Sequence, residues 1–272
     1  MFFAWIFLLG VVASTVGSLV GLGGGVFIVP VLLFLRPVVD ELATITPQIA
    51  VGTSLVVVCF TALGSTLTYA KQKKVDFSSG LFFFLACGPG SMLGAFLNRG
   101  LNEQEFQLFF GFMMLLILYL LIRNKRIKPK NINWHVEKEY IDSNGKKHSY
   151  GYHRYIAFFI CFFIGVAQGL LGIGGGALLV PALILLFWFP AHLAIATTMF
   201  IVLLASIAGS VSHFYLQNID WLLVLILAPG ALLGGQLGAF ISSRLSSTRL
   251  TVLLKGMLLV IAVFSIWKGL SS

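Results

Sequence analysis

Two glycine-rich segments have the residue types and spacing that best fit a chemical task. Gly21–Pro30 reads GLGGGVFIVP and Gly172–Pro181 reads GIGGGALLVP, so the glycines and the proline recur at identical spacing. Consecutive glycines weaken a helix and let its backbone unwind. Where a short helix then begins, free N–H groups and the positive end of the helix dipole form an anion site. The candidate ligand-binding glycines are Gly23, Gly24, Gly25, Gly174, Gly175 and Gly176.

Close packing is the alternative explanation of these glycines, because small residues let membrane helices approach one another. Packing alone does not require three consecutive glycines followed at fixed spacing by Pro30 and Pro181. A nucleotide site is not expected, since a Rossmann or P-loop motif needs a strand before the glycines within a soluble βαβ unit. We therefore expect two opposed glycine breaks that hold a small anion without a buried Lys or Arg.

Polar side chains inside the apolar runs form a second group of candidates. Thr53–Ser54 and Thr197–Thr198 lie at matched places in the chain. Their hydroxyls either donate to an anion or bond back to their own helix, and we favour ligand contact. Gln48 and Gln168 carry neutral amides, which donate to an oxyanion at a lower desolvation cost than a charge does. An interhelical hydrogen bond is the alternative role of these glutamines.

His213 is the candidate coupling residue, because a histidine can carry a proton near neutral pH. It aligns with Tyr69 when the two halves are compared, and the alternative is an interfacial histidine at the cytoplasmic end of its span. An enzyme is not expected, since no carboxylate lies inside an apolar run to complete a catalytic cluster. Three isolated cysteines form no C-x-x-C pair, so we expect neither a metal nor a cofactor.

The elements that position these residues are strongly apolar. Of 272 residues, 58% are hydrophobic and 10% are charged, with a mean hydropathy of +0.99. A typical soluble domain is about 25% charged, so a water-soluble globular protein is excluded. Continuous apolar runs without polar alternation indicate membrane helices rather than a β-barrel. The eight runs are 2–36, 45–70, 77–98, 105–122, 154–189, 192–216, 221–242 and 250–268.

The first and fifth runs are too long for one straight span. Residues 2–35 in a single helix would measure roughly 51 Å, whereas the hydrocarbon core is about 30 Å thick. Each helix must break or turn back, and we expect this at Gly23–Gly25 and Gly174–Gly176. The predicted fold class is an all-α polytopic membrane protein of about eight transmembrane helices.

The two halves of the chain form an internal repeat with four landmarks in the same order. The landmarks are the glycine segments, Ala50–Ser54 with Ala194–Thr198, Val75–Phe77 with Ile219–Trp221, and Pro89–Gly94 with Pro229–Gly234. Four spans per half is an even number, so we expect a parallel repeat with the site between the halves. The predicted units are a first four-helix repeat at 1–122, a linker loop at 123–153 and a second repeat at 154–272.

The net charge of +9 is a topology signal rather than evidence of a nucleic-acid partner. Half of the 18 Lys and Arg lie between Arg123 and Arg154. With eight crossings, this stretch and both termini share one side, which holds 13 Lys and Arg against four. The positive-inside rule then places both termini and the 123–153 loop in the cytoplasm. This loop either binds anionic lipid or is simply a cytoplasmic anchor.

The paired glycine–proline segments, the hydroxyl pairs and the paired Pro-Gly-x-x-x-Gly segments together resemble the TauE/SafE family of sulfite exporters, also called the toluene-sulfonate uptake permease family. The resemblance covers almost the whole chain. It implies a secondary carrier that moves sulfite, sulfoacetate or a related organosulfonate across the cell membrane by alternating access. Without an ATP-binding motif, the energy must come from a gradient. An anion channel and a non-transporting membrane scaffold are the alternatives.

Overall fold

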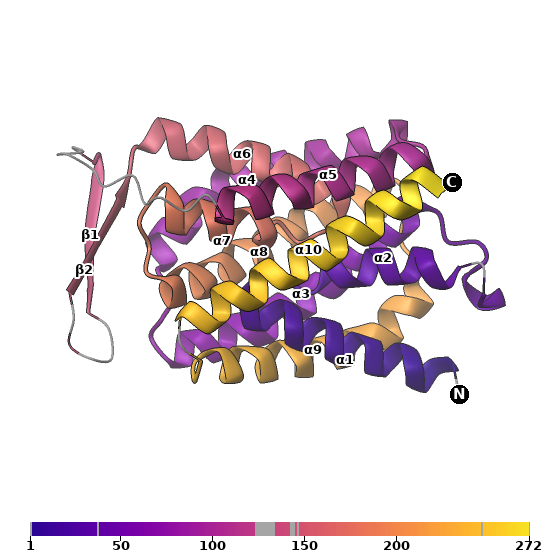
Figure 1. Ribbon diagram of the computed structural model, residues 1–272, viewed down its shortest axis with the longest axis horizontal. Coiled ribbons are helices and arrows are strands. Elements are labelled where there is room, and N and C mark those ends of the chain that lie inside the picture. Colours follow the sequence, from indigo (N-terminus) through magenta and orange to yellow (C-terminus); the bar gives the residue numbers. More distant parts are fainter. Residues whose placement is uncertain are drawn as a thin grey trace.

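The computed structural model describes residues 2–36, 38–122, 134–141, 145, 147–245 and 247–271. This part of the chain is almost entirely helical (Figure 1). The helices are α1 (Phe2–Val20), α2 (Gly25–Leu35), α3 (Pro47–Lys71), α4 (Phe77–Leu97), α5 (Glu103–Ile122), α6 (Arg154–Leu171), α7 (Gly176–Leu185), α8 (Ala191–Tyr215), α9 (Trp221–Ser242) and α10 (Ser247–Ser271), with short 3₁₀ turns at Asp40–Leu42 and Asn98–Gly100. Two strands, β1 (Val136–Ile141) and β2 (Lys147–Tyr152), complete the described elements.

Six helices in the described part are long and apolar enough to cross a membrane. This confirms a multi-pass helical membrane protein. The six segments are Phe3–Val20, Pro47–Lys71, Phe77–Gly100, Arg154–Leu171, Ala191–Tyr215 and Trp221–Ser242. Two further long helices, α5 and α10, pack along each other in opposite directions: Gly111 lies against Ile266, and Gly269 lies against Leu108. The predicted count of eight spans is not established by these six.

The predicted breaks at the glycine segments are confirmed. Helix α1 ends at Val20 and α2 begins at Gly25, while α6 ends at Leu171 and α7 begins at Gly176. Gly24 and Gly175 cap the new helices in the left-handed conformation, with φ of 83° and 68°. Residues other than glycine rarely adopt this conformation, because a Cβ atom would clash with the backbone.

Each broken helix turns back instead of continuing across the bundle. Helix α2 runs toward the same end as the two termini, where Phe34 meets Phe264 of α10 at a ring distance of 5.5 Å (Figure 1). Helix α7 returns to the strands, because the connection after it accepts a hydrogen bond from Gly151 of β2 at the carbonyl oxygen of Phe187. Both apolar runs are therefore re-entrant pairs.

The structure does not confirm the predicted parallel repeat with both termini and the 123–153 loop on one side. Both termini lie at one end of the bundle and the two strands lie at the other (Figure 1). The physical reason is the re-entrant pair, which begins and ends on the same side and so contributes no net crossing. Helices α3, α4 and α5 then carry the first half from one end to the other, and α8, α9 and α10 carry the second half back.

Part of the predicted linker loop is an ordered hairpin. Strands β1 and β2 pair in antiparallel register from Val136 opposite Tyr152 to Ile141 opposite Lys147. Tyr150 and Tyr152 are buried by packing against the helices. The sequence analysis missed this hairpin, although the pair Asn144-Gly145 between two polar–aromatic runs is a signal that could have indicated it. Residues 123–133, which hold much of the predicted lipid-binding charge, lie outside the described residues.

The opposite placement of the hairpin and the C-terminus predicts a labelling pattern. Two variants are made in a chain whose three native cysteines are replaced by alanine: Gly145→Cys, and a cysteine added after Ser272. We expect their thiol labelling to differ in intact cells. A membrane-impermeant thiol reagent will label only one of them, and both will react after permeabilisation. Equal labelling of the two before permeabilisation would contradict the fold.

Candidate functional site

The two glycine loops meet each other halfway along the bundle. Gly23 and Gly174 both approach Val58 of α3 and Val202 of α8, which lie near the middle of those helices. A Cβ atom on Gly25 would collide with the carbonyl oxygen of Gly172. Reciprocally, a Cβ atom on Gly176 would collide with the carbonyl oxygen of Gly21. We call residues 21–25 and 172–176 the glycine crossing; the structure thus brings all six predicted glycines together.

The starts of α2 and α7 supply hydrogen-bond donors at this crossing. The first N–H groups of a helix have no partner inside the helix, and a side chain usually caps them. Here the capping positions are Gly24 and Gly175, which carry no side chain that accepts a hydrogen bond. Two uncapped helix starts, each at the positive end of its dipole, therefore lie beside each other in a buried place.

Gln168 adds an unpaired amide to the second loop. Its side chain is fully buried, and neither Oε1 nor Nε2 has a hydrogen-bond partner. The amide stands against Gly175, where an added Cβ atom would lie 3.1 Å from Cδ of Gln168. A buried amide without a partner costs about 1–3 kcal/mol, so its retention suggests a partner that binds there.

The first loop has no such amide. The position matched to Gln168 is Gly17, which packs directly on Gly24. Nearby hydroxyls satisfy one another, since Oγ of Ser14 lies 2.8 Å from Oγ1 of Thr61. The two loops of the crossing are alike in backbone and different in polar chemistry, which inspection of the repeat had not revealed.

The hydroxyl pairs divide between two tasks. Thr53 accepts a hydrogen bond from the backbone N–H of Asp220 at 2.9 Å, and Thr197 accepts one from Asp76 at 3.1 Å. These two threonines hold the starts of α9 and α4. Ser54 donates to the carbonyl oxygen of Gly172 at 3.0 Å, and the buried Oγ1 of Thr198 has no partner. Ser54 therefore lies at the crossing.

Thr198 occupies the place matched to Ser54 in the second half. It lies on the same face of α8 as Ile195 and Val202, because residues three and four apart share a helix face. Ile195 contacts Gly21 and Val202 contacts Gly23. The unpaired hydroxyl thus lies on the helix face that borders the first loop.

Gln48 and His213 lie away from the glycines of the crossing. The amide of Gln48 donates to the carbonyl oxygen of Leu101, in the connection between α4 and α5, at 2.8 Å. His213 is fully buried within the protein, in the last turn of α8. Its Nε2 lies 3.1 Å from the carbonyl oxygen of Gly169, one residue after Gln168, and its Nδ1 has no partner.

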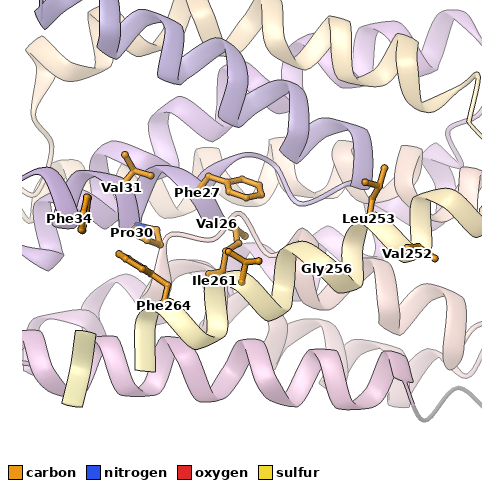
Figure 2. Close-up of a pocket in the computed structure, with 11 residues that line it drawn as sticks. Val26, Phe27, Pro30, Val31, Phe34, Val252, Leu253, Gly256, Ile261 and Phe264 are labelled. Atoms are coloured by element: carbon orange, nitrogen blue, oxygen red, sulfur yellow. The ribbon is translucent and has the colours of Figure 1, made fainter. Parts of the chain in front are cut away.

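The glycine crossing is closed to solvent, since residues 21–25 and 172–176 are all buried. A separate hollow of about 680 Å³ lies between α2 and α10, where Figure 2 shows Phe27, Pro30 and Phe264 on its wall. Its lining is apolar, so it suits hydrocarbon rather than an anion. The cavity predicted between the halves is therefore not this hollow.

Comparison with known proteins identifies the family. Residues 6–265 match the family described as Sulfite exporter TauE/SafE. The chain belongs to the TauE/SafE family. It is 43% identical over 273 residues, covering all of both chains, to the "Probable membrane transporter protein YunE" of Bacillus subtilis. No solved structure matches the chain.

More distant TauE/SafE relatives extend over nearly the same length. A "Probable membrane transporter protein" of Xylella fastidiosa is 26% identical over 97% of this chain and 94% of its own. One from Methanocaldococcus jannaschii is 26% identical over 94% of this chain and 92% of its own. The chain is thus a multi-pass protein of a membrane transporter family, and these relatives point to transport rather than catalysis.

The close contact at the crossing predicts that an added methyl group lowers stability there but not at an open position of the chain. We expect Gly25→Ala and Gly176→Ala each to lower the free energy of unfolding by about 1–3 kcal/mol, because backbone must move to admit the Cβ atom. Gly256→Ala in α10 is the control, since its Cβ atom meets nothing within 4 Å. Thermal unfolding in detergent measures the three variants. A melting temperature for Gly25→Ala as high as that of the control would disprove the contact.

Proposed function

We propose that the chain is a secondary carrier that binds one small oxyanion at the glycine crossing and moves it across the cell membrane by alternating access. The unpaired amide of Gln168 beside the uncapped start of α7 is the observation that carries this proposal. Amide N–H groups and a helix start together satisfy the oxygens of an anion. Gly174–Gly176 lie on the second-loop side together with Ser54, which bonds to Gly172, and Gly23–Gly25 lie opposite with Thr198 on the helix face that borders the first loop.

A small oxyanion fits this set of donors better than a large or cationic substrate. The donors are neutral, closely spaced and buried, so they replace the water around a compact anion without a countercharge. The family description names sulfite, and we propose sulfite, sulfoacetate or a related organosulfonate as the substrate.

Alternating access is supported by contacts that pair across the halves. The Thr53–Asp220 hydrogen bond at one end of the bundle has a counterpart in the Thr197–Asp76 hydrogen bond at the other. We propose two inverted repeats, each a re-entrant pair followed by three spans, with α5 and α10 as the last span of each. Inverted repeats place the substrate at their interface and let one half rock against the other.

The orientation of the protein in the membrane follows from the number of basic residues at each end of the bundle. Among the described residues, the hairpin end holds eight Lys and Arg, at 71, 73, 74, 138, 147, 154, 244 and 249, whereas the opposite end holds three, at 36, 99 and 268. The positive-inside rule places the hairpin end in the cytoplasm and both termini outside. This basic end also suits contact with anionic lipid of the inner leaflet.

His213 is our candidate for proton coupling. It is buried beside the second loop, and its unpaired Nδ1 leaves one ring nitrogen free to exchange a proton. A proton gradient would then supply the energy for transport, since histidine changes charge near neutral pH.

Replacing Gln168 by leucine is expected to raise the stability of the protein and to lower its transport. Gln168→Leu removes a buried amide that lacks a partner, so we expect the free energy of unfolding to increase by about 1 kcal/mol. Counterflow of radiolabelled sulfite in proteoliposomes will fall about tenfold or more, because a hydrogen bond to a charged ligand contributes about 1.5–3 kcal/mol. Gln107→Leu in α5 is the matched control, since Gln107 is also buried and its Nε2 also has no partner.

The control variant should gain stability and keep its counterflow. Saturable counterflow also separates a carrier from a channel, which would show conductance in planar bilayers instead. Equal counterflow in Gln168→Leu and the wild-type protein would remove Gln168 from the site and refute the proposal.

A further inference from the structure

The β1–β2 hairpin joins both halves of the bundle at one end. On one side it contacts the start of α4, where Nζ of Lys138 lies 2.8 Å and 3.0 Å from the two carboxylate oxygens of Asp76. On the other side it contacts the connection between α7 and α8, where Gly151 donates its N–H to the carbonyl oxygen of Phe187 at 3.1 Å. The hairpin is therefore a bridge between the first half and the second.

Asp76 is the polar centre of this bridge. Its carboxylate accepts hydrogen bonds from Lys138, from Oγ of Ser79 at 2.6 Å and from the hydroxyl of Tyr150 at 3.0 Å. Burial raises the pKa of Asp76, but the hydrogen bonds from Lys138 and Ser79 outweigh it, so the pKa is below its ordinary value. The pKa of Tyr150 is raised by burial and by Asp76, so its phenol stays protonated and donates.

Aromatic packing seals the same bridge. The ring of Tyr150 lies 4.3 Å from that of Phe189, just before α8. The ring of Tyr152 lies 4.8 Å from that of Phe83 in α4 and 6.0 Å from that of Phe187. These rings pack between α4 and the α7–α8 connection and keep water out of the contact.

The opposite end of the bundle has no equivalent bridge among the described residues. Asp220 occupies the place matched to Asp76 and caps α9 by accepting from the N–H of Leu223 at 3.0 Å. Within the part of the chain that the structure describes, no salt bridge joins it to a cation. The inserted hairpin thus makes two otherwise matched ends unequal.

We propose that the hairpin is a gate strap that holds the hairpin end of the carrier closed through Lys138 and Tyr150, so that the end opens only when their contacts with Asp76 break. The inference rests on the proposed function, because a gate has meaning only in a protein that opens alternately to two sides. Since Asp76 also donates its N–H to Thr197, opening the strap frees the α4–α8 contact beneath it.

Hydrogen exchange measured by mass spectrometry tests the strap without any substrate. We expect Lys138→Met to speed amide exchange in peptides covering 76–83 and 187–194 by about tenfold or more, since charged hydrogen bonds to a largely buried carboxylate are lost. Tyr150→Phe, which keeps the ring, will speed the same peptides by a smaller factor. Peptides around Asp220 will stay unchanged in both variants.

Lys147→Met is the matched control on the same hairpin. Lys147 makes only a 3.9 Å contact with Glu139, and the side chains are 71% and 63% exposed, against 29% and 10% for Lys138 and Asp76. This control should leave exchange in both peptides unchanged. Unchanged exchange in Lys138→Met and Tyr150→Phe would overturn the strap, whatever the protein transports.

Crosslinking then distinguishes a gate from a fixed cover. Tyr150→Cys with Phe189→Cys, in a chain lacking the native cysteines, will be joined by a short bifunctional thiol reagent. We expect the joined variant to lose counterflow of radiolabelled sulfite compared with the same double-cysteine variant before the reagent is added, while the reagent leaves the counterflow of Phe189→Cys alone unchanged. Full counterflow in the joined variant would overturn the gate. Absence of counterflow in the wild-type protein would contradict the proposed carrier function. The exchange experiment would still test the strap, because it needs no substrate.

Discussion

The contact between two backbones at the centre of the bundle is the constraint on which the rest of the structure depends. Gly25 faces the carbonyl oxygen of Gly172, and Gly176 faces that of Gly21, with no room for a side chain at either place. For both loops to reach the centre, α1 and α6 must enter deeply and turn back. Each half then makes an odd number of passages, and the central hairpin lies opposite the termini.

The symmetric backbone carries asymmetric chemistry. Hydroxyls of α1 and α3 satisfy each other around the first loop, as Ser14 and Thr61 do, whereas the amide of Gln168 beside the second loop has no partner. The two halves place their helix starts at Gly25 and Gly176 in the same way, and only the second half adds a buried amide, that of Gln168, without a hydrogen-bond partner. The hairpin adds a second asymmetry at one end only, where Lys138 and Tyr150 meet Asp76.

The sequence predicted local breaks well and the path of the chain poorly. Consecutive glycines have a local cost in a helix, so the breaks before Gly25 and Gly176 were readable. Whether a broken helix continues or returns depends on packing against distant segments, so the sequence did not reveal that the hairpin and the termini lie at opposite ends of the bundle. Gln48 and Gln168 looked alike in sequence, yet only neighbours from elsewhere in the chain give one a carbonyl partner and leave the other unpaired.

An unpaired amide at a closed crossing gives ligand binding a direct means of changing the conformation. In the proposed carrier, a hydrogen bond from Gln168 to an anion would relieve the cost of about 1–3 kcal/mol that an unpaired buried amide bears. A ligand shifts a conformational equilibrium only by its difference in affinity for the two states. The loops touch through glycine backbone, with one side-chain hydrogen bond from Ser54 to Gly172 across them. Few specific interactions must therefore break at the crossing itself for the two loops to move apart.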